Sequence, residues 1–133
     1  MTKPHINVII CTPGHSLMGI YVKSLLALID RLKQEGLSVA WSNEFSSHVA
    51  DAREMTLSGT NQNLIDEQRP FHGNVTYDTL LWIDSDIMFT PDDAMKLIKS
   101  DKKIISGAYM LASGEVMAYK ELLAGPYVYD EVL

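Results

Sequence analysis

The sequence predicts an α/β fold with a mostly parallel sheet and helices on both faces. Three observations lead to this prediction. Apolar runs at residues 6–11 and 80–83 are typical of strands buried between two layers, and Trp82 is therefore expected in the core. From residue 17 to 32, apolar residues recur at helical spacing. The alternating segment 37–41 then completes a strand–helix–strand order, which predicts two parallel strands with a right-handed crossover.

The first strand and helix have clear boundaries in the sequence. Thr12, Pro13 and Gly14 form a tight turn at the carboxyl end of the strand, on the side where parallel sheets bind ligands. Ser16 is expected to cap the following helix, because its hydroxyl can accept a hydrogen bond from a free N–H of the first turn. Gly36 is expected to end that helix, since glycine tolerates the left-handed conformation found just beyond helix ends.

The later elements are predicted with fewer signals. Residues 46–57 are expected to form a short helix, and residues 61–69 a further helical turn. Thr90 followed by Pro91 is a strong helix start, with a capping hydroxyl and proline at the first helical position. Residues 104–111 are predicted to form another strand.

Composition excludes several classes of function. At 133 residues, the chain is expected to be a single domain spanning 1–133. A net charge of −6 gives no basic surface for a nucleic-acid polymer. No apolar run reaches the length of a membrane span. The single cysteine, Cys11, cannot form an internal disulfide, so a reducing, cytoplasmic location is expected.

The most informative residues are Asp84 and Asp86, which follow the predicted central strand of the sheet at about residues 79–83. If the backbone is still extended there, residues two apart point to the same side, and both carboxylates face one volume. Two such charges repel unless a cation lies between them, and oxygen ligands suit a hard ion such as Mg²⁺ or Mn²⁺. The alternative is structural, because Asp84 could simply start an Asx-turn.

The order of elements and the segment Leu-Leu-Trp-Ile-Asp-Ser-Asp-Ile-Met-Phe at residues 80–89 resemble the GT-A-fold glycosyltransferases. The resemblance extends over residues 5–111 and includes Thr-Pro-Asp-Asp at 90–93 and Ile-Ile-Ser-Gly-Ala-Tyr at 104–109. It implies a Rossmann-like, GT-A donor-binding half that binds a nucleotide-diphosphate sugar. The expected cofactor is Mn²⁺ or Mg²⁺.

The resemblance also implies roles for individual residues. Asp86 would be the main metal ligand, and Asp84 would contact the ribose or a metal-bound water. The turn after the first strand would meet the nucleotide through Thr12, Pro13 and Gly14. Arg53 matches the arginine of an Ala-Arg-Asn donor-binding motif, although this chain has Glu54 in place of the asparagine.

The chain departs from the family in length. Complete enzymes continue into an acceptor-binding half, whereas only a short tail follows here, and its acids Glu115, Glu121, Asp130 and Glu131 lie in no recognisable motif. The sequence therefore leaves open whether the chain is an enzyme, which would be a glycosyltransferase if active. It names neither the acceptor, the sugar nor a catalytic base. An open sheet without its second half could be covered by a partner chain, as in a homo-oligomer.

Three hypotheses follow. The first is a metal-dependent glycosyltransferase-like protein that binds a nucleotide-diphosphate sugar. The second is a non-catalytic nucleotide-binding module or a truncated fragment. The third is a haloacid dehalogenase-like phosphatase, which also places Asp-x-Asp after a strand. That family, however, prefers Thr or Val where Met88 stands and needs more chain downstream than follows Asp86.

Overall fold

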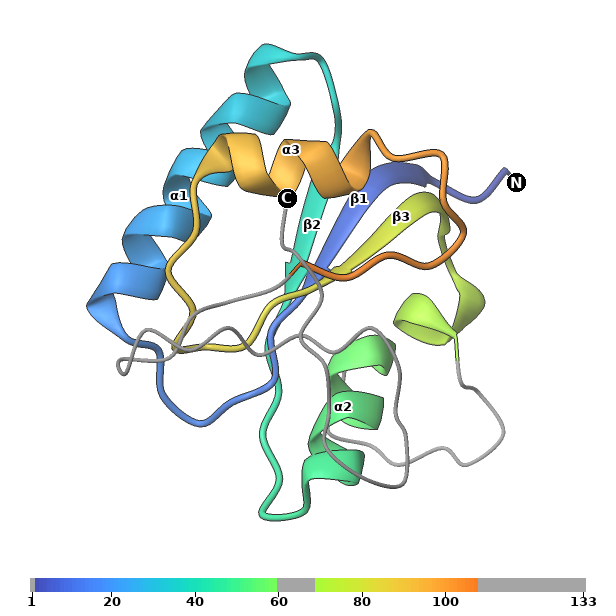
Figure 1. Ribbon diagram of the computed structural model, residues 1–133. Helices are drawn as coiled ribbons and strands as arrows, with labels where there is room; N and C mark the ends of the chain where they lie inside the picture. Colours follow the sequence, from blue (N-terminus) through green and yellow to red (C-terminus); the bar gives the residue numbers. More distant parts are fainter. Residues whose placement is uncertain (1, 60–68, 108–133) are drawn as a thin grey trace, which may run out of the picture. The chain divides into compact units, whose positions relative to one another are not determined.

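The computed structural model describes residues 2–59 and 69–107 (Figure 1). The chain divides into two compact units, Met1–Ile98 and Lys99–Leu133, and the prediction of a single domain remains a prediction. All regular elements among the described residues belong to the first unit. In chain order they are β1 (His5–Cys11), α1 (Gly19–Gln34), β2 (Val39–Ser42), α2 (Val49–Ser58), the short 3₁₀ helix η1 (Pro70–Gly73), β3 (Thr76–Trp82) and α3 (Pro91–Ile98).

The three strands form a parallel sheet in the order β2-β1-β3. Ile10 of β1 pairs with Trp41 of β2 and with Leu81 of β3, which fixes the register on both sides. Because all strands run the same way, their carboxyl ends lie at one edge of the sheet and their amino ends at the other. The sequence placed the strand before Asp84 at the centre, but β1 is the central strand of the described sheet.

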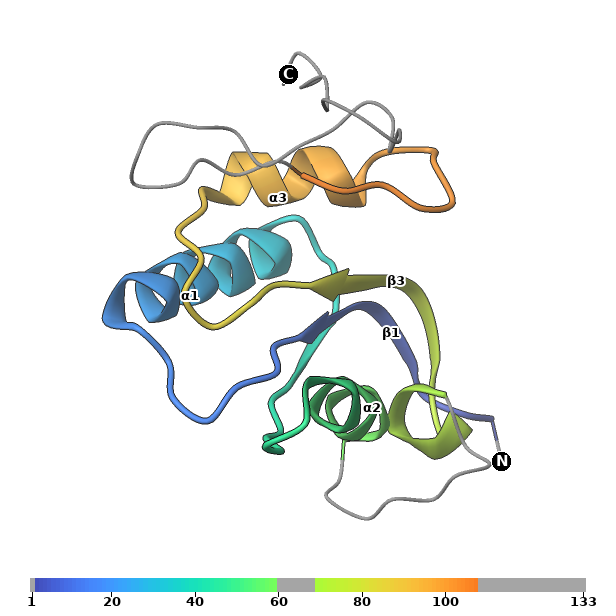
Figure 2. The ribbon, with the colours of Figure 1, turned by 60° about the horizontal axis from the view of Figure 1, so that its bottom comes forward.

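Helices cover both faces of the sheet, as the sequence predicts. Figure 2 shows α1 and α3 on one face and α2 with η1 on the other. The main core lies between the sheet and the pair α1 and α3, where complete burial of aliphatic side chains stabilises the fold by about 1.5–3 kcal/mol for each residue. Its buried members are Val8, Ile10, Tyr21, Leu25, Leu28, Leu32, Leu81, Ala94 and Met95. The fold is thus a Rossmann-like α/β arrangement.

Helix α1 begins later than the sequence predicts. Ser16 is not its N-cap, because the helix starts at Gly19 and its N-cap is Met18, which makes no side-chain capping bond. The chain stays extended at Met18 because its backbone N–H donates to the Ser85 carbonyl, 3.1 Å away, before the helix can begin. The predicted end is confirmed, since Gly36 has a left-handed φ of +76° and follows the C-cap Glu35.

The start of α3 is confirmed in detail. The Asp93 N–H donates to Thr90 Oγ1 and the Thr90 N–H donates to Asp93 Oδ2, both at 3.1 Å. These reciprocal bonds satisfy two backbone donors at the helix end, as in a capping box. They hold the pKa of Asp93 below its usual range, because hydrogen bonds from Thr90 favour the ionised carboxylate.

Two further sequence predictions are wrong in the described residues. Trp82 is 42% exposed rather than buried, because it is the last residue of an edge strand, whereas its neighbour Leu81 is buried. Residues 104–107 form no strand, and Ile104 is 94% exposed. Strand propensity alone does not fix a strand, because packing and pairing decide it. The predictions for residues 61–68, 108–111 and the tail acids lie outside the described residues.

Candidate functional site

Segments that follow the three strands meet at the carboxyl edge of the sheet. We call residues 12–15, 43–45 and 84–86 the carboxyl-edge site. The Gly14 N–H donates to the Glu44 carbonyl at 3.1 Å, and the Met18 N–H donates to the Ser85 carbonyl at the same distance. The Ile83 N–H donates to the Cys11 carbonyl at 3.0 Å, which extends the pairing of β1 and β3 up to the acids. Backbone bonds therefore hold the three segments side by side.

Asp84 and Asp86 are exposed and lie on a turn. The turn is closed by the Ile87 N–H, which donates to the backbone oxygen of Asp84 at 3.3 Å. The prediction that both carboxylates face one volume required an extended backbone here, but β3 ends at Trp82, and Ser85 and Asp86 form a turn. Strand alternation therefore does not set the directions of the two carboxylates. They are nevertheless accessible to a ligand at the carboxyl edge, where the sequence placed them.

Gly14 packs directly against the residue between the two acids. A Cβ atom at position 14 would lie 2.7 Å from Ser85 Oγ and 3.1 Å from Ser85 Cβ, and the φ of Gly14 is +150°. Both the close approach and the positive φ favour glycine. The predicted nucleotide-contacting turn and the predicted metal-binding turn are therefore in contact.

Thr12 has a structural role in the core, which limits its predicted role as a contact to the nucleotide. Its side chain is fully buried, is hydrogen-bonded to the Tyr21 hydroxyl and accepts a bond from Trp41 Nε1 at 3.1 Å. Burial raises the pKa of Tyr21, although its bonds to Thr12 and Trp41 act in the opposite direction. The Thr12 hydroxyl therefore makes its hydrogen bonds inside the core, whereas Pro13 and Gly14 are half-buried.

Asn43 is a site residue that the sequence analysis missed. Its Nδ2 donates to the carbonyl of Thr12 at 2.6 Å and to that of Gly14 at 3.0 Å. One side chain therefore holds both ends of the predicted nucleotide-contacting turn. A signal was present, because Asn43 comes two residues after the predicted strand 37–41, and parallel strands all end at the same edge.

His15 and Phe45 form an aromatic pair beside this turn. Their ring centroids are 4.8 Å apart and the rings meet edge to face at 75°. Phe45 is 49% exposed, and His15 is also exposed. The pair therefore offers accessible aromatic surface within the carboxyl-edge site.

Arg53 lies on α2, the helix that covers the other face from α1, and its side chain is exposed. Ala52 and Thr56 are the buried residues of that helix. Within the described part of the chain, no hydrogen bond or ion pair links Arg53 to Asp84, Asp86 or the turn at residues 12–14. Its predicted contact with a donor phosphate remains a prediction.

The described residues contain no group of three or more His, Cys, Asp or Glu side chains that could hold a metal ion. Asp84 and Asp86 can therefore supply two carboxylates at most. This number fits Mg²⁺ or Mn²⁺ bound together with a diphosphate, because such ions keep several waters and often take one or two carboxylates plus substrate phosphates. It does not fit a protein cage that binds the metal alone.

A pocket of about 410 Å³ lies between α1 and the segment that leads into α3, and its lining is mostly apolar. Ile20 and Ala27 line it from the helix, and Met88, Phe89 and Pro91 line it from the segment. None of the six predicted site residues lines this pocket. The candidate site is thus on the surface formed by the turns and not in this pocket.

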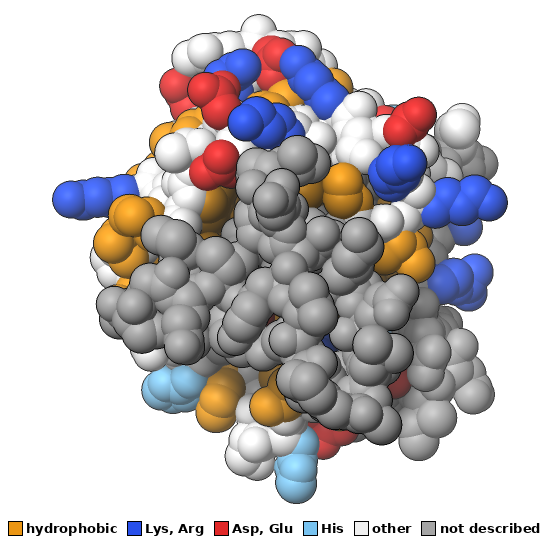
Figure 3. All heavy atoms as spheres, viewed as in Figure 1, with side chains coloured by type: hydrophobic (Ala, Val, Ile, Leu, Met, Phe, Trp, Pro, Cys, Tyr) orange, Lys and Arg blue, Asp and Glu red, His pale blue; other side chains and the backbone are white. Residues whose placement is uncertain are grey.

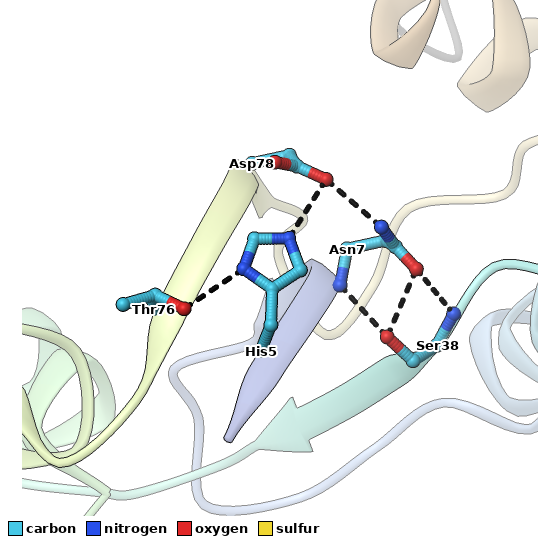
Figure 4. Close-up of polar contacts among 5 residues, drawn as sticks. All are labelled: His5, Asn7, Ser38, Thr76 and Asp78. Atoms are coloured by element: carbon cyan, nitrogen blue, oxygen red, sulfur yellow. Dashed lines mark hydrogen bonds and ion pairs between the residues drawn. The ribbon is translucent and has the colours of Figure 1, made fainter. Parts of the chain in front are cut away.

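The opposite edge of the sheet carries a second polar group, which Figure 4 shows. We call it the amino-edge cluster, and it consists of His5, Asn7, Ser38, Thr76 and Asp78. His5 lies between Thr76 Oγ1, at 2.8 Å from Nδ1, and Asp78 Oδ2, at 3.1 Å from Nε2. Hydrogen bonds from Asn7 and His5 hold the pKa of Asp78 below its usual range. None of these residues had a role predicted from the sequence.

Cys11 lies at the end of β1 and is fully buried. Burial raises the pKa of its thiol to about 12, because the thiolate would be poorly solvated there. The thiolate is the reactive form of cysteine, so Cys11 is a core residue and not a nucleophile.

The described surface is mixed in charge. Where α1 ends and α3 lies, Figure 3 shows acidic and basic side chains close together. Arg31 pairs there with Asp92 at 2.9 Å and with Glu35 at 3.5 Å. Among the described helices, none combines the length and the apolar composition that crossing a membrane requires.

Fold and site together define a class, namely a Rossmann-like α/β protein with exposed carboxylates at the carboxyl edge of its parallel sheet. Comparisons with protein-family models, curated proteins and solved structures gave no match. The function is therefore argued from the residues themselves.

Proposed function

We propose that this chain is a metal-dependent glycosyltransferase-like protein that binds a nucleotide-diphosphate sugar at the carboxyl-edge site. One observation carries the proposal: the turn bearing Asp84 and Asp86 touches the turn at residues 12–14 through Ser85 and Gly14. A donor of this class has a nucleoside at one end and a diphosphate near its middle. Two touching turns at a sheet's carboxyl edge suit such a ligand.

The metal would act between the protein and the diphosphate. The chain has a net charge of −6, and two exposed carboxylates would repel a diphosphate without a cation between them. When bound, Mn²⁺ or Mg²⁺ would act as a Lewis acid that stabilises charge developing on the nucleotide leaving group. Asp86 and Asp84 would hold the ion, and the phosphates with water would complete its oxygen ligands.

Other residues of the site support binding of the nucleoside. The exposed ring of Phe45, with His15 beside it, can stack on a base, and such contacts are worth about 1–3 kcal/mol per base. Asn43 holds the turn at residues 12–14 in place, so it positions the turn without needing to touch the ligand. Arg53 would add a bidentate phosphate contact through its planar guanidinium.

A non-catalytic nucleotide-binding module would use the same site without transferring sugar. The two functions differ in turnover and not in the donor site. Incubation with labelled donors and detection of free sugar or glycoside distinguishes them, since enzymes commonly turn over at about 1 s⁻¹ or faster. We propose binding as the primary property and expect slow or absent turnover from this chain alone.

The test is the melting temperature in the presence of nucleoside diphosphates, with and without Mn²⁺. A ligand at a hundredfold over its dissociation constant stabilises the folded state by about 2.7 kcal/mol. We expect this stabilisation only when the nucleotide and Mn²⁺ are both present, because each strengthens the binding of the other. It should disappear in Asp86→Ala and persist in Asp30→Asn, which neutralises an exposed aspartate of α1, outside the site.

Two results would contradict the proposal. One is an absence of any Mn²⁺-dependent shift across a broad set of nucleoside diphosphates. The other is equal binding by Asp86→Ala and the unaltered protein, which would show that Asp86 is not the main metal ligand.

A further inference from the structure

The amino-edge cluster contains a hydroxyl, an imidazole and a carboxylate in one hydrogen-bonded row (Figure 4). Thr76 Oγ1 lies 2.8 Å from His5 Nδ1, and His5 Nε2 lies 3.1 Å from Asp78 Oδ2. Both distances are within the range over which a base takes a proton from a nucleophile and a third group orients the base. His5 and Thr76 are register partners on neighbouring strands, so the backbone itself sets this arrangement.

The carboxylate of Asp78 determines which nitrogen of His5 can accept a proton. An ionised carboxylate only accepts hydrogen bonds, so neutral His5 must donate to it from Nε2. Nδ1 then has a free lone pair that faces the Thr76 hydroxyl, and that hydroxyl becomes the donor. With its lone pair directed at the hydroxyl, Nδ1 can act as a general base, and the two ring nitrogens exchange the roles that they have in a Ser-His-Asp triad.

A second layer of bonds holds the carboxylate. Asn7 Nδ2 donates to Asp78 Oδ2 at 2.9 Å, and the Asn7 Oδ1 accepts from the backbone N–H of Ser38 at 2.8 Å and from its hydroxyl at 3.0 Å. The Ser38 hydroxyl also accepts from the Asn7 N–H at 2.9 Å. Asn7 is therefore fixed at both ends and in turn fixes Asp78.

Stability alone gives little reason for such an ordered network. The His5 and Asp78 side chains are 46% and 57% exposed, and Thr76 is exposed as well. Polar groups at that level of exposure can bond to water instead, so an exposed ion pair contributes little to the stability of the fold. An ordered, accessible hydroxyl next to an oriented imidazole is, in contrast, the arrangement of an activated nucleophile.

We propose that Thr76 is an acyl-accepting nucleophile, with His5 as its general base and Asp78 as the residue that positions His5. The hydroxyl oxygen of Thr76 forms an ester bond to the acyl carbon of the donor, and the bond from that carbon to the leaving oxygen breaks. The hydroxyl proton passes to His5 Nδ1, and the leaving group departs with the electron pair of the broken bond. The imidazolium then returns its proton to solvent or to the leaving group.

The donor class is an activated acyl compound whose leaving group departs through oxygen, such as an aryl ester or an acyl phosphate. Its leaving group is stable as an anion, so no separate acid is needed to protonate it as the bond breaks. The amino-edge cluster and the carboxyl-edge site lie at opposite ends of the seven-residue β1, about 20 Å apart at about 3.3 Å per residue. The acyl-transfer activity is therefore independent of donor binding at the other edge.

The experiment incubates the whole chain with p-nitrophenyl acetate and locates acetyl groups by peptide mass spectrometry over time. We expect an acetyl ester on Thr76, no label at position 76 in Thr76→Val, and retained labelling at that position in Thr76→Ser. His5→Gln should slow labelling of Thr76 by at least about tenfold, since general bases contribute about 10²–10⁴-fold. Asp78→Asn should also slow it, because an amide can donate to Nε2 and leave the proton on Nδ1.

His48→Gln is the matched control, because it removes an exposed histidine outside the cluster and should leave the rate at Thr76 unchanged. A purely structural cluster predicts no acetyl ester on Thr76 in either the original chain or Thr76→Ser, and that result would overturn the proposal. Equal rates in His5→Gln and the original chain would overturn it too. If His5→Gln does not fold, Thr76→Ser and Thr76→Val still test whether the hydroxyl at position 76 is acetylated.

Discussion

The two edges of the sheet hold their polar groups in different ways. At the carboxyl edge, backbone atoms bond to one another across the turns, and Asp84 and Asp86 are left exposed. At the amino edge, side chains bond to side chains, and His5 has a partner on each ring nitrogen. An edge whose turns are held by backbone hydrogen bonds, and whose carboxylates are accessible, suits binding of an external ligand. A row of connected side chains suits movement of a proton within the protein.

The largest effect is expected from the residue that anchors the carboxyl edge to the core. Thr12→Val keeps the shape but removes the buried hydroxyl that pairs with Tyr21 and Trp41. A buried polar group left without its partner costs about 1–3 kcal/mol, so the free energy of unfolding should fall by about 2 kcal/mol. Urea denaturation measures it, and a loss below about 0.5 kcal/mol would show that the hydroxyl is not an anchor.

A smaller loss of stability and a clear loss of binding are expected from Asn43→Ala. The change removes two hydrogen bonds to the turn at residues 12–14, each worth about 0.5–1.5 kcal/mol. We expect the unfolding free energy to fall by about 1–2 kcal/mol and the Mn²⁺-dependent affinity for nucleoside diphosphate to fall as well. Titration calorimetry on the folded variant measures the second effect. Unchanged affinity would mean that this turn does not take part in donor binding.

At the amino edge the expected effect depends on pH. The pKa of Asp78 is lowered in the folded protein, first by its hydrogen bond from Asn7 and then by that from His5. Its stabilising contribution is therefore present above the ordinary carboxyl pKa of about 3.9 and is lost as the pH falls through the lower folded-state value. Asp78→Asn should weaken this acid-side loss, measured as melting temperature against pH. If the melting temperature of the variant falls with decreasing pH as steeply as that of the original chain, Asp78 does not contribute to the loss of stability in acid.

The smallest effect is expected from Ser16→Ala, which lies next to the carboxyl-edge site but caps no helix. Its unfolding free energy should change by less than about 0.5 kcal/mol. Thr90→Ala is the matched comparison, because Thr90 does accept the Asp93 N–H, and loss of a cap costs about 1 kcal/mol. Equal losses in the two variants, measured by urea denaturation, would contradict the helix start seen at Gly19.

The parts of the fold that the sequence predicted are those set by local patterns. The strand beginning near Ile6, the glycine just beyond the end of α1 and the cap at Thr90 each depend on neighbouring residues, and all three are confirmed. The shared edge of the two predicted turns was also predictable, because parallel strands end together. The failures at Ser16 and Trp82 have non-local causes, namely a bond from Met18 to Ser85 and a position at the end of an edge strand.

The candidate sites were predicted only in part for the same reason. Asp84 and Asp86 carry a recognisable spacing, but their turn conformation depends on where β3 ends. Asn43 acts on residues 29 and 31 positions away, and His5 meets Thr76 across 71 positions. Strand register creates such contacts, and no single-sequence pattern specifies register between strands so far apart.

The central claim is that the turn at residues 12–14 and the turn at residues 84–87 form one site for a metal and a nucleoside diphosphate. Mn²⁺ is paramagnetic and broadens the NMR signals of nearby amides, so it reports its own position. With nucleoside diphosphate present, substoichiometric Mn²⁺ should broaden the amide signals of Gly14, Asp84, Ser85 and Asp86 and leave those of His5 and Thr76 sharp. Broadening centred on the amino edge, or none at either turn, would contradict the account.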